Sequence, residues 1–336
     1  MISTQLPQLL RPRALGPGDL VVVAALSGPL DARYAPDLRR AVAEIERMGF
    51  RVRLAPLLEA GRRRWWSAAR PEEIAEEFNG LLRDPEVRAI VAHDGGQTVF
   101  GYLDLIDFDA IRADPKPILG YSDISLLHLV LHARTGLVGF HADVATPGLG
   151  GHWQRVSAAR RDELGKLYAT LLTGTEPLGA LPTGPSWECW RPGRAEGPLI
   201  GGVINRVVLA QATPFALPLE RFDGAVLFWE ELGGQASHVW TYLHILRHSG
   251  VLDRIGGMVV GVPQAIDGLG SPDGPPNLAE IVLDVLGDRD IPVLGNVDIG
   301  HAGPNLPMPL GIRAALDAQK RTLSLLEPAV RPRTDG

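Results

Sequence analysis

Hydrophobic and polar positions in the first part of the chain follow two alternating patterns. Short segments at residues 20–26, 51–54 and 87–93 predict strands, and the first of them, Leu-Val-Val-Val-Ala-Ala-Leu, is typical of a strand buried on both faces. Residues 34–48 and 71–82 carry apolar side chains at helical spacing and predict helices between these strands. Strands that alternate with helices usually pair in parallel, so the pattern predicts a layered α/β domain.

A second series of elements begins after residue 197. Its predicted strands lie at 225–229, 257–262, 292–296 and, as a pair, within 311–326. Its predicted helices lie at 239–249 and 278–286. Between the two series the pattern weakens, because Gly and Pro cluster there and only one helix, at 155–172, is predicted. We therefore expect an N-terminal domain at 1–150, a linker with a helix and a loop at 151–196, and a C-terminal domain at 197–336.

Composition and charge exclude several classes of function. The chain has 336 residues, enough for two domains, and a formal net charge of −6, which argues against nucleic acid as the main partner. Its one cysteine, Cys189, allows neither an intrachain disulfide nor a cysteine metal cage. No apolar run is long enough to span a bilayer, and residues 1–13 lack the apolar core of a signal peptide. These observations predict a cytoplasmic protein that binds neither membranes nor nucleic acid.

The most informative local pattern is a predicted strand-to-helix turn at Ser122. The predicted strand at 117–119 is followed by Gly-Tyr, by Ser122, and then by a predicted helix at 126–133. Such a turn raises a hydroxyl above the edge of a sheet, near the positive end of the next helix. Gly28 and residues 95–96 also follow predicted strands, so we expect them at the same edge as Ser122. An isolated Ser-Asp pair is also a common helix cap, so this pattern alone does not identify a nucleophile.

Two residues further along the chain have the chemistry that a serine nucleophile needs. Glu230 follows the predicted strand at 225–229, and His301 lies in a loop rich in Gly and Pro. A neutral serine needs an imidazole to accept its proton, and the imidazole needs an acceptor that fixes its tautomer. The order Ser, Glu, His therefore favours a triad. A strand-end acid also fits a salt bridge at the edge of the sheet, and a histidine in such a loop also fits simple exposure.

Six segments carry a resemblance to a known family. They lie at residues 11–19, 84–90, 115–125, 196–202, 227–231 and 300–311. The most specific is Pro-Lys-Pro-Ile-Leu-Gly-Tyr-Ser-Asp-Ile-Ser at 115–125. Through these segments the chain resembles, over nearly its whole length, the LD-carboxypeptidase family of serine peptidases, which includes the microcin C immunity peptidases. The resemblance implies a layered Rossmann- or flavodoxin-like N-terminal α/β domain and a smaller β-rich α+β C-terminal domain, with the active site at their interface.

The same resemblance implies roles for individual residues. It makes Ser122 the nucleophile, His301 the general base and Glu230 the residue that orients the base. The backbone N–H groups of Gly96 and Asp123 are expected to form the oxyanion hole. Substrate-binding positions are expected at Gly95, Gln97, Tyr121, Gly201 and Gly202. The resemblance implies no cofactor and no metal, a small peptide or amide substrate, and a homodimer.

Three functions are compatible with these residues. The first is a serine carboxypeptidase that removes the terminal D-Ala of a muropeptide through an acyl-enzyme. The second is a self-immunity or resistance amidase that acts on a peptidyl- or aminoacyl-nucleotide-like toxin. Residues 93–97 favour an altered pocket, because they read His-Asp-Gly-Gly-Gln where typical family members have Arg-Gly-Gly-Tyr-Gly, and Asp94 disfavours an anionic group there. The third, from another class, is a binding protein that keeps the fold without turnover.

Three other motifs have weaker functional interpretations. His128 and His132 are spaced as in some zinc sites, but position 129 is Leu rather than the Glu of zinc proteases, so packing is the preferred interpretation. Residues 95–96 are not followed by Lys and Ser or Thr, which excludes a P-loop. The basic and aromatic residues 62–66 are interpreted as a solvated loop or as a lid over the pocket.

Overall fold

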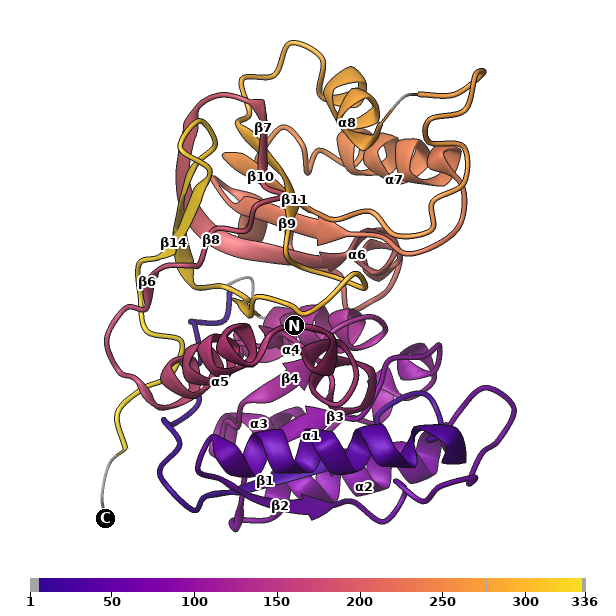
Figure 1. Ribbon diagram of the computed structural model, residues 1–336, viewed down its shortest axis with the longest axis vertical. Helices are drawn as coiled ribbons and strands as arrows, with labels where there is room; N and C mark the ends of the chain where they lie inside the picture. Colours follow the sequence, from indigo (N-terminus) through magenta and orange to yellow (C-terminus); the bar gives the residue numbers. More distant parts are fainter. Residues whose placement is uncertain (1–5, 276, 334–336) are drawn as a thin grey trace.

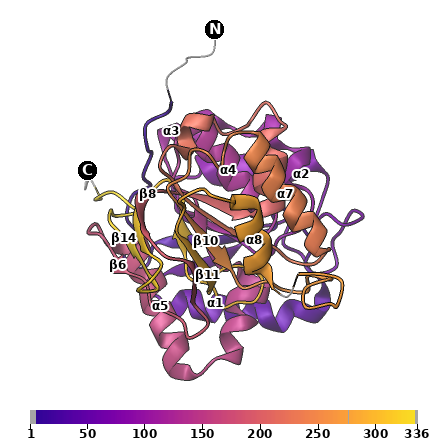
Figure 2. The same cartoon turned by 90° about the horizontal axis from the view of Figure 1, so that it is seen from above.

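The computed structural model describes residues 6–275 and 277–333 and has two parts, each built around one β-sheet (Figure 1). The first part contains the N-terminal half of the chain and the second lies against it (Figure 1), so that in the view from above the second part covers the first (Figure 2). Residues 1–5, which begin the segment predicted to lack a signal peptide, lie outside the described residues. Within the described ranges, the helices are too short or too polar to cross a bilayer.

The sheet of the first part has six strands in the order β12-β5-β4-β3-β1-β2. The strands are β1 (Leu20–Ala24), β2 (Arg51–Leu54), β3 (Val87–Ala92), β4 (Ile118–Gly120), β5 (Phe140–His141) and β12 (Met308–Pro309). All neighbouring pairs are parallel except β5 and β12. Every residue of β1 is buried, as expected for a strand covered on both faces. The predicted parallel α/β domain is therefore confirmed.

Five helices flank this sheet. They are α1 (Ala35–Arg47), α2 (Pro71–Arg83), α3 (Phe108–Ala113), α4 (Ile124–Thr135) and α5 (Ala158–Thr173). Helices α1 and α5 pack on one face, and α2, α3 and α4 lie behind the sheet in Figure 1. Helix α1 begins with a proline in its first turn and ends just before Gly49, whose φ of +95° suits a residue without a Cβ. Helix α4 is buried almost all round, because the second part covers its outer side.

The sheet of the second part has eight strands in the order β6-β14-β13-β8-β9-β10-β11-β7. The strands are β6 (Gly179–Ala180), β7 (Glu188–Arg191), β8 (Arg194–Val203), β9 (Val226–Glu230), β10 (Gly257–Gly261), β11 (Val293–Val297), β13 (Arg313–Asp317) and β14 (Thr322–Leu325). Strands β8 to β11 are parallel and the outer ones are antiparallel. The helices are α6 (Ile204–Gln211), α7 (Ala236–His248) and α8 (Leu278–Leu286), of which α7 and α8 lie side by side (Figure 2).

Short helical turns connect these elements. They are η1 (Ala32–Tyr34), η2 (Val99–Gly101), η3 (Leu103–Leu105), η5 (His152–Arg155) and η6 (Leu219–Phe222), with a π-helical turn η4 (Ala145–Leu149). The sequence pattern did not predict β5, β6, β7, β8, β12 or α6. Strand β7, Glu-Cys-Trp-Arg, lies at the edge of its sheet and is half exposed, so it shows no apolar run. The segment interpreted as a linker and loop thus supplies two strands to the second sheet.

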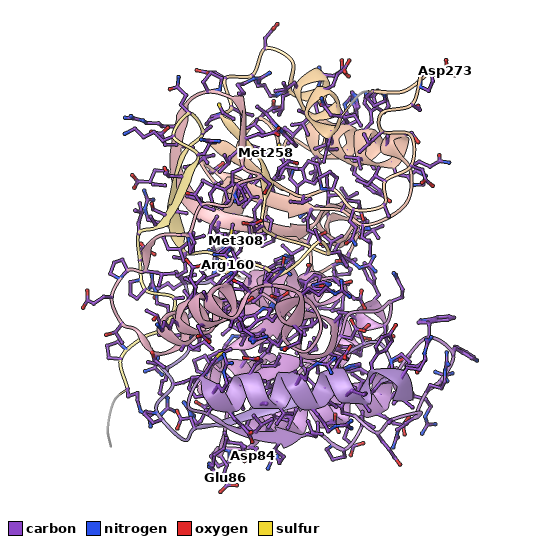
Figure 3. All side chains as sticks on the ribbon, in the orientation of Figure 1. Asp84, Glu86, Arg160, Met258, Asp273 and Met308 are labelled. Carbon is purple, nitrogen blue, oxygen red and sulfur yellow. The ribbon has the colours of Figure 1, made fainter. Side chains whose placement is uncertain are left out.

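The two parts interlock where they meet. Strand β12 comes from the C-terminal half of the chain but pairs with β5 of the first sheet, and Figure 3 labels its Met308 at the junction of the two parts. Helix α4 of the first part contacts both β8 and α6 of the second. The Ser125 hydroxyl on α4 accepts a hydrogen bond from the Val203 N–H at 3.2 Å. Residues at the carboxyl end of β9 therefore lie close to those after β4.

Candidate active site

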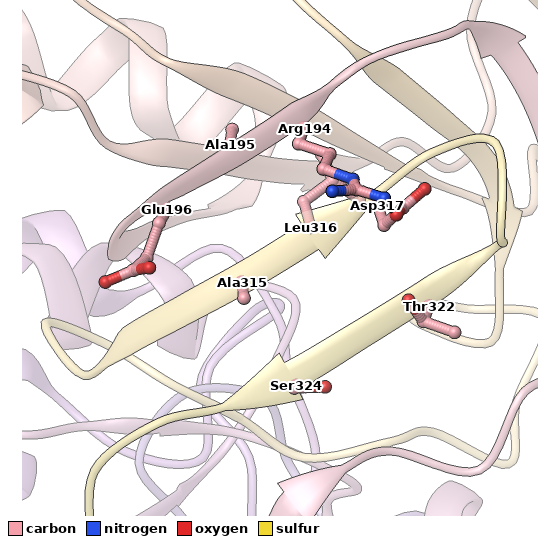
Figure 4. A pocket seen from close by; sticks show the side chains of 8 residues that line it. All are labelled: Arg194, Ala195, Glu196, Ala315, Leu316, Asp317, Thr322 and Ser324. Atoms are coloured by element: carbon pink, nitrogen blue, oxygen red, sulfur yellow. Dashed lines mark hydrogen bonds and ion pairs between the residues drawn. The ribbon is translucent and has the colours of Figure 1, made fainter.

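Two cavities of similar size differ in their chemistry. A shallow groove of 430 Å³ lies over β8, β13 and β14 (Figure 4), and its charged residues already pair, since Arg194 Nε donates to Asp317 Oδ2 at 2.8 Å. A cavity of 360 Å³ between the two parts is lined by both Ser122 and His301. We call this second space the central cavity. Its lining combines a hydroxyl, an imidazole and unpaired charged groups, so it is the candidate active site.

Ser122 lies on a strained turn between β4 and α4. Its φ is +63°, a left-handed conformation that costs a residue with a Cβ on the order of 1 kcal/mol. Gly120 before it has a φ of +159°, and a Cβ there would lie 3.1 Å from the Ala92 side chain. The turn presents the Ser122 side chain to the central cavity at the N-terminus of α4, where the helix dipole favours negative charge. The predicted strand-to-helix turn is therefore confirmed.

His301 and Glu230 form a hydrogen-bonded pair. His301 Nδ1 lies 2.9 Å from Glu230 Oε2, and the carboxylate is buried at the end of β9. Gly300 allows this approach, because a Cβ at that position would lie 2.5 Å from Glu230 Oε2. With Nδ1 donating to the carboxylate, Nε2 is left as the proton acceptor of the ring. The imidazole also packs against the Tyr121 ring in a T-shaped arrangement, with 4.9 Å between ring centroids.

Ser122 and His301 face the same cavity without a direct bond. Among the hydrogen bonds of the described residues, none joins the Ser122 hydroxyl to the His301 ring. Proton transfer requires the two atoms to approach to about 2.6–3.2 Å, and such bonds are often longer in free enzymes than in complexes with substrate. The shared cavity fits a nucleophile and its base, and their catalytic roles stay a prediction.

The loop after β3 lies against the nucleophile. A Cβ on Gly95 would lie 2.5 Å from Ser122 Oγ, and the Gly28 N–H donates to the Gly95 carbonyl at 2.8 Å. The expectation that these three residues share one edge of the sheet is thus confirmed. In the described part of the chain, no hydrogen bond uses the backbone N–H of Gly96 or of Asp123. Both groups are therefore free to donate, and their role in an oxyanion hole stays a prediction.

We expect the Gly95→Ala variant to lose most activity, because its methyl group would displace the Ser122 hydroxyl. A misplacement of about 1 Å at a reacting atom costs roughly 10²-fold in rate, so kcat/KM should fall by at least that factor. Peptide hydrolysis and Ser122 labelling by a fluorophosphonate measure the effect. Gly80→Ala in α2 is the matched control, because a Cβ there meets no atom within 4 Å and should leave activity unchanged. Activity of the Gly95 variant within threefold of the parent would contradict the prediction.

A buried ion pair connects the nucleophile turn to the second part. Arg206 Nε on α6 donates to Asp123 Oδ1 at 2.9 Å, and both side chains are nine-tenths or more buried. Asp123 Oδ2 accepts hydrogen bonds from the Ser27 hydroxyl at 2.6 Å and from the Thr98 N–H at 2.7 Å. Arg206 Nη2 also donates to Gln97 Oε1 at 2.6 Å. The pair therefore fixes the loop of Gly95 and Gly96 relative to Ser122.

A second buried carboxylate holds the loop of His301. Asp143, just after β5, accepts hydrogen bonds from Trp153 Nε1 at 2.7 Å, from the Asn305 N–H at 2.8 Å and from Asn305 Nδ2 at 2.7 Å. The Tyr168 hydroxyl donates to the Asn305 carbonyl at 3.0 Å. Burial raises the pKa of Asp143 to about 6, although its hydrogen-bond donors oppose this effect. Since Asn305 lies four residues after His301, the network anchors the histidine loop to the first part.

The protonation state of Glu231 should affect the free energy of unfolding. It is buried beside Glu230, and burial first, then the neighbouring carboxylate, raises its pKa to about 7 from the ordinary 4.5. Because folding raises this pKa, the protonated side chain contributes its full stability below pH 4.5. This contribution is lost as the pH rises through 7. Glu231→Gln keeps an acceptor for Asn205 Nδ2 and the Leu232 N–H.

We therefore expect Glu231→Gln to be more stable than the parent at pH 8, by about 1–2 kcal/mol after allowance for solvent screening. Most of this gain should vanish at pH 5, where the native side chain is largely protonated in the folded state. Urea unfolding at the two pH values measures the difference. If the variant is instead less stable than the parent at pH 8, the prediction is wrong, and the charged Glu231 carboxylate must be stabilised in the folded parent.

The other predicted site residues lie around the central cavity rather than all in its wall. Tyr121 lines it, whereas Gly95 lies against Ser122 and Gly96 against Ser27. Gln97 is exposed and bonded to Arg206. Gly201 and Gly202 on β8 allow close packing, since a Cβ at Gly201 would lie 1.7 Å from the Phe228 carbonyl and one at Gly202 2.7 Å from the Ser125 side chain.

The alternative motifs have structural explanations. His128 Nε2 and His132 Nδ1 each lie 3.0 Å from a backbone carbonyl, that of Gly120 and that of Leu137, and both rings are buried. Burial lowers the pKa of both to about 4, so they are neutral packing residues. In the described ranges, His, Cys, Asp and Glu side chains form no cluster that could hold a metal ion. Trp65 and Trp66 are mostly exposed and do not line the central cavity, which favours the solvated loop over the lid.

Sequence reasoning missed the residues that support the site. Arg206 and Asp143 occur in segments with no recognisable motif, and Asn305 lies in the segment 300–311, which carries the resemblance but assigned no role to this residue. A weak signal exists for Arg206, since a charged residue in the otherwise apolar Val-Ile-Asn-Arg-Val-Val-Leu-Ala segment needs a partner if the helix is buried. Asp143 offers a similar signal, because it interrupts an apolar run after β5. In neither case does the sequence indicate the partner.

The chain matches known proteins over almost its full length. Residues 21–142 match the family model of the LD-carboxypeptidase N-terminal domain, and residues 196–316 match that of the LD-carboxypeptidase C-terminal domain. The microcin C7 self-immunity protein MccF of Escherichia coli is 28% identical over 96% of this chain and 96% of its own. A probable murein peptide carboxypeptidase of Bacillus subtilis is 29% identical over 93% of both chains.

Solved structures agree with these sequence matches. The structure of MccF in the apo state of an inactive mutant superimposes with a TM-score of 0.85, covering 96% of this chain and 99% of that chain at 25% identity. A further structure of MccF, in complex with aspartyl sulfamoyl adenosine, gives a TM-score of 0.84 over the same shares of the two chains, also at 25% identity. The two-part α/β architecture is therefore shared with a family of known fold.

Proposed function

The chain belongs to the LD-carboxypeptidase family of serine peptidases, and from this membership we propose that it removes the carboxy-terminal D-amino acid from a murein-derived peptide with Ser122 as nucleophile. The observation that carries the proposal is the His301–Glu230 pair, at 2.9 Å, in the wall of the cavity that Ser122 also lines. A buried carboxylate that orients an imidazole beside a strained serine is the arrangement that acyl transfer needs.

The proposed reaction has two steps. Ser122 Oγ attacks the carbonyl carbon of the scissile amide while His301 Nε2 accepts the hydroxyl proton. The N–H groups of Gly96 and Asp123 stabilise the negative oxygen of the tetrahedral intermediate, each by about 3 kcal/mol. His301 then gives its proton to the leaving amine, the C–N bond breaks, and an ester on Ser122 remains. Water, deprotonated by His301, attacks this ester and releases the shortened peptide and the free hydroxyl.

A second candidate function is hydrolysis of an amide in an aminoacyl-nucleotide-like toxin. It is supported by the likeness to MccF, a self-immunity protein whose solved structures include a complex with aspartyl sulfamoyl adenosine. The loop at 93–97 also differs from that of typical carboxypeptidases, and the His93 side chain is buried against the Gly28 carbonyl at 2.9 Å. A third candidate, a binding protein without turnover, predicts no reaction at Ser122.

One experiment separates these candidates. The purified protein is incubated with a murein tetrapeptide that ends in D-Ala and, separately, with aspartyl sulfamoyl adenosine, and the products are analysed by mass spectrometry. Release of D-Ala alone supports the first function, and release of aspartate alone supports the second. If neither substrate reacts and a fluorophosphonate fails to label Ser122, the protein is a binding protein.

Cellular location, assembly and domain limits also stay proposals. We propose a cytoplasmic homodimer whose domains span 1–150 and 197–336. Cell fractionation and light scattering of the purified protein test the first two statements. Limited proteolysis followed by mass spectrometry tests the limits, because cleavage concentrated in 151–196 is expected only if that segment is a linker.

A further inference from the structure

A buried contact outside the central cavity joins the first part to the loop that carries the proposed general base. Asp143 follows β5, which pairs in parallel with β4, the strand that leads to Ser122. Its partner Asn305 lies four residues after His301 in the loop 298–307 between β11 and β12, which we call the histidine loop. Neither residue of the contact lines the central cavity, so the contact acts on a reaction there only through the residues that it holds in place.

The carboxylate of Asp143 binds Asn305 twice. Oδ2 accepts a hydrogen bond from the Asn305 N–H at 2.8 Å, and Oδ1 accepts one from Asn305 Nδ2 at 2.7 Å. Two bonds to one carboxylate fix the direction of the bound residue as well as its distance. Asp143 is itself held in place, because Trp153 Nε1 donates to Oδ2 at 2.7 Å and the Asp143 N–H donates to the Tyr168 hydroxyl at 2.8 Å. All four side chains are buried, so water does not compete for these bonds.

The histidine loop has few other polar contacts with the first part. Within the described ranges, every hydrogen bond from this loop to the first part ends on Asn305. Arg160 and Asp298 form an ion pair across the same junction at a longer distance of 3.9 Å. Ser122 belongs to the first part, whereas His301 is carried by the loop. The distance between these two side chains therefore depends on the contact that Asn305 makes.

We infer that Asp143 is a positioning residue for the general base, and that through Asn305 it sets the place of His301 relative to Ser122. The inference rests on the proposed function, in which His301 accepts the proton of the Ser122 hydroxyl. Proton transfer requires the two atoms to approach to about 2.6–3.2 Å, and a misplacement of about 1 Å costs roughly 10²-fold in rate. Loss of the contact should therefore slow acylation of Ser122 and leave the binding of a reagent in the cavity unchanged.

Exchange of the two contacting groups distinguishes this contact from general stability. Asn305→Asp places a second carboxylate against that of Asp143, and the two like charges repel. Adding Asp143→Asn removes this repulsion, because the amide at position 143 donates to the carboxylate at position 305. The amide oxygen still accepts from Trp153 Nε1 and from the N–H of residue 305. The double variant thus exchanges the two groups and keeps the contact.

Labelling of Ser122 by a fluorophosphonate tests the inference without a known substrate. Rates measured over a range of reagent concentrations separate the maximal rate from the concentration that gives half of it. We expect Asn305→Asp and Asp143→Ala each to lower the maximal rate at least about tenfold, with the half-maximal concentration unchanged. The double variant should return to within about threefold of the parent.

Lys116→Met is the matched control for the loss of a buried polar contact. Its ammonium group is buried, pairs with Asp114 at 3.2 Å and precedes β4, at the opposite end of that strand from Ser122. This variant should unfold at a lower urea concentration than the parent and label at the parent rate. Circular dichroism shows which variants are folded at the assay temperature. If Asn305→Asp is unfolded, Asn305→Ala replaces it, and it should slow labelling less than Asp143→Ala, because it keeps the backbone bond to Asp143.

The outcomes separate this inference from the proposed function. If Ser122 of the parent is not labelled, both are overturned. If the parent is labelled and the variants at positions 143 and 305 react at the parent rate, the proposed function stands and the positioning role is wrong. The role is also wrong if the double variant stays as slow as Asn305→Asp, or if Lys116→Met slows labelling as much as Asp143→Ala. A loss in the single variants that the exchange restores supports both.

Discussion

Replacing Ser122 with alanine is expected to lower kcat/KM by about 10⁴–10⁶-fold, the range seen when the nucleophile of a serine hydrolase is removed. The alanine lacks the oxygen that forms the acyl-enzyme, so only binding and the oxyanion donors remain to speed the direct attack of water. Steady-state hydrolysis of whichever substrate reacts, measured with the parent and the variant at equal concentration, checks the size of the loss. Electrospray mass spectrometry should also show no fluorophosphonate adduct on the variant.

The Ser122→Gly variant distinguishes chemistry from folding. Glycine accepts a φ of +63° without strain, so this variant should be at least as stable as Ser122→Ala, with a difference of about 1 kcal/mol. Both variants should be equally inactive. If either keeps activity within tenfold of the parent, Ser122 is not the nucleophile, and another hydroxyl or a bound water must carry the reaction.

The largest loss of stability is expected for Arg206→Met. This change removes the cation and leaves the Asp123 carboxylate buried without its charge partner, which typically costs about 3–5 kcal/mol. The methionine fills most of the space of the arginine, so the cost comes from the lost charge rather than from a cavity. Urea unfolding of the two proteins at pH 7 measures the difference. We also expect slower acylation of Ser122, because Arg206 fixes Gln97 and the loop before it.

Two further variants serve as controls for the Arg206→Met result. The double variant Asp123→Asn with Arg206→Met should recover part of the loss, since it removes both charges at once. Arg313→Met breaks the pair between Arg313 and Glu196, two exposed side chains, and should change the free energy of unfolding little, because solvent screens their charges. A cost for Arg206→Met as small as that of Arg313→Met would mean that solvent reaches the buried pair.

The pattern of apolar residues predicted the positions of those site residues that lie at the ends of strands. Ser122 and Glu230 each follow a run of apolar residues, and such runs fix both the strand and the point at which it ends. His301 was predicted from its loop of small residues, and Gly300 proves to be needed for contact with Glu230. The positions of these residues could be predicted because the relevant signal is local, a few residues long, and directly reflects burial, whereas their catalytic roles stay a prediction.

The supporting residues depend on contacts between distant segments. Arg206 and Asp123 are 83 residues apart, and Asn305 and Asp143 are 162 residues apart. No periodicity or motif encodes such a pairing, because it arises only when two parts with separate sheets meet. Strand β7 was missed for a related reason: its half-exposed edge position needs no apolar run, so its strand character depends on its neighbour β11.

The pairing of β12 with β5 has a consequence for the order in which the molecule can form. The first sheet takes its last strand from residues 308–309, after almost all of the second part has been made. A nascent chain that has only its N-terminal half outside the ribosome therefore has an open sheet edge at β5. That edge stays open until residues 308–309 have been made, so the first sheet is completed only after most of the second part has left the ribosome.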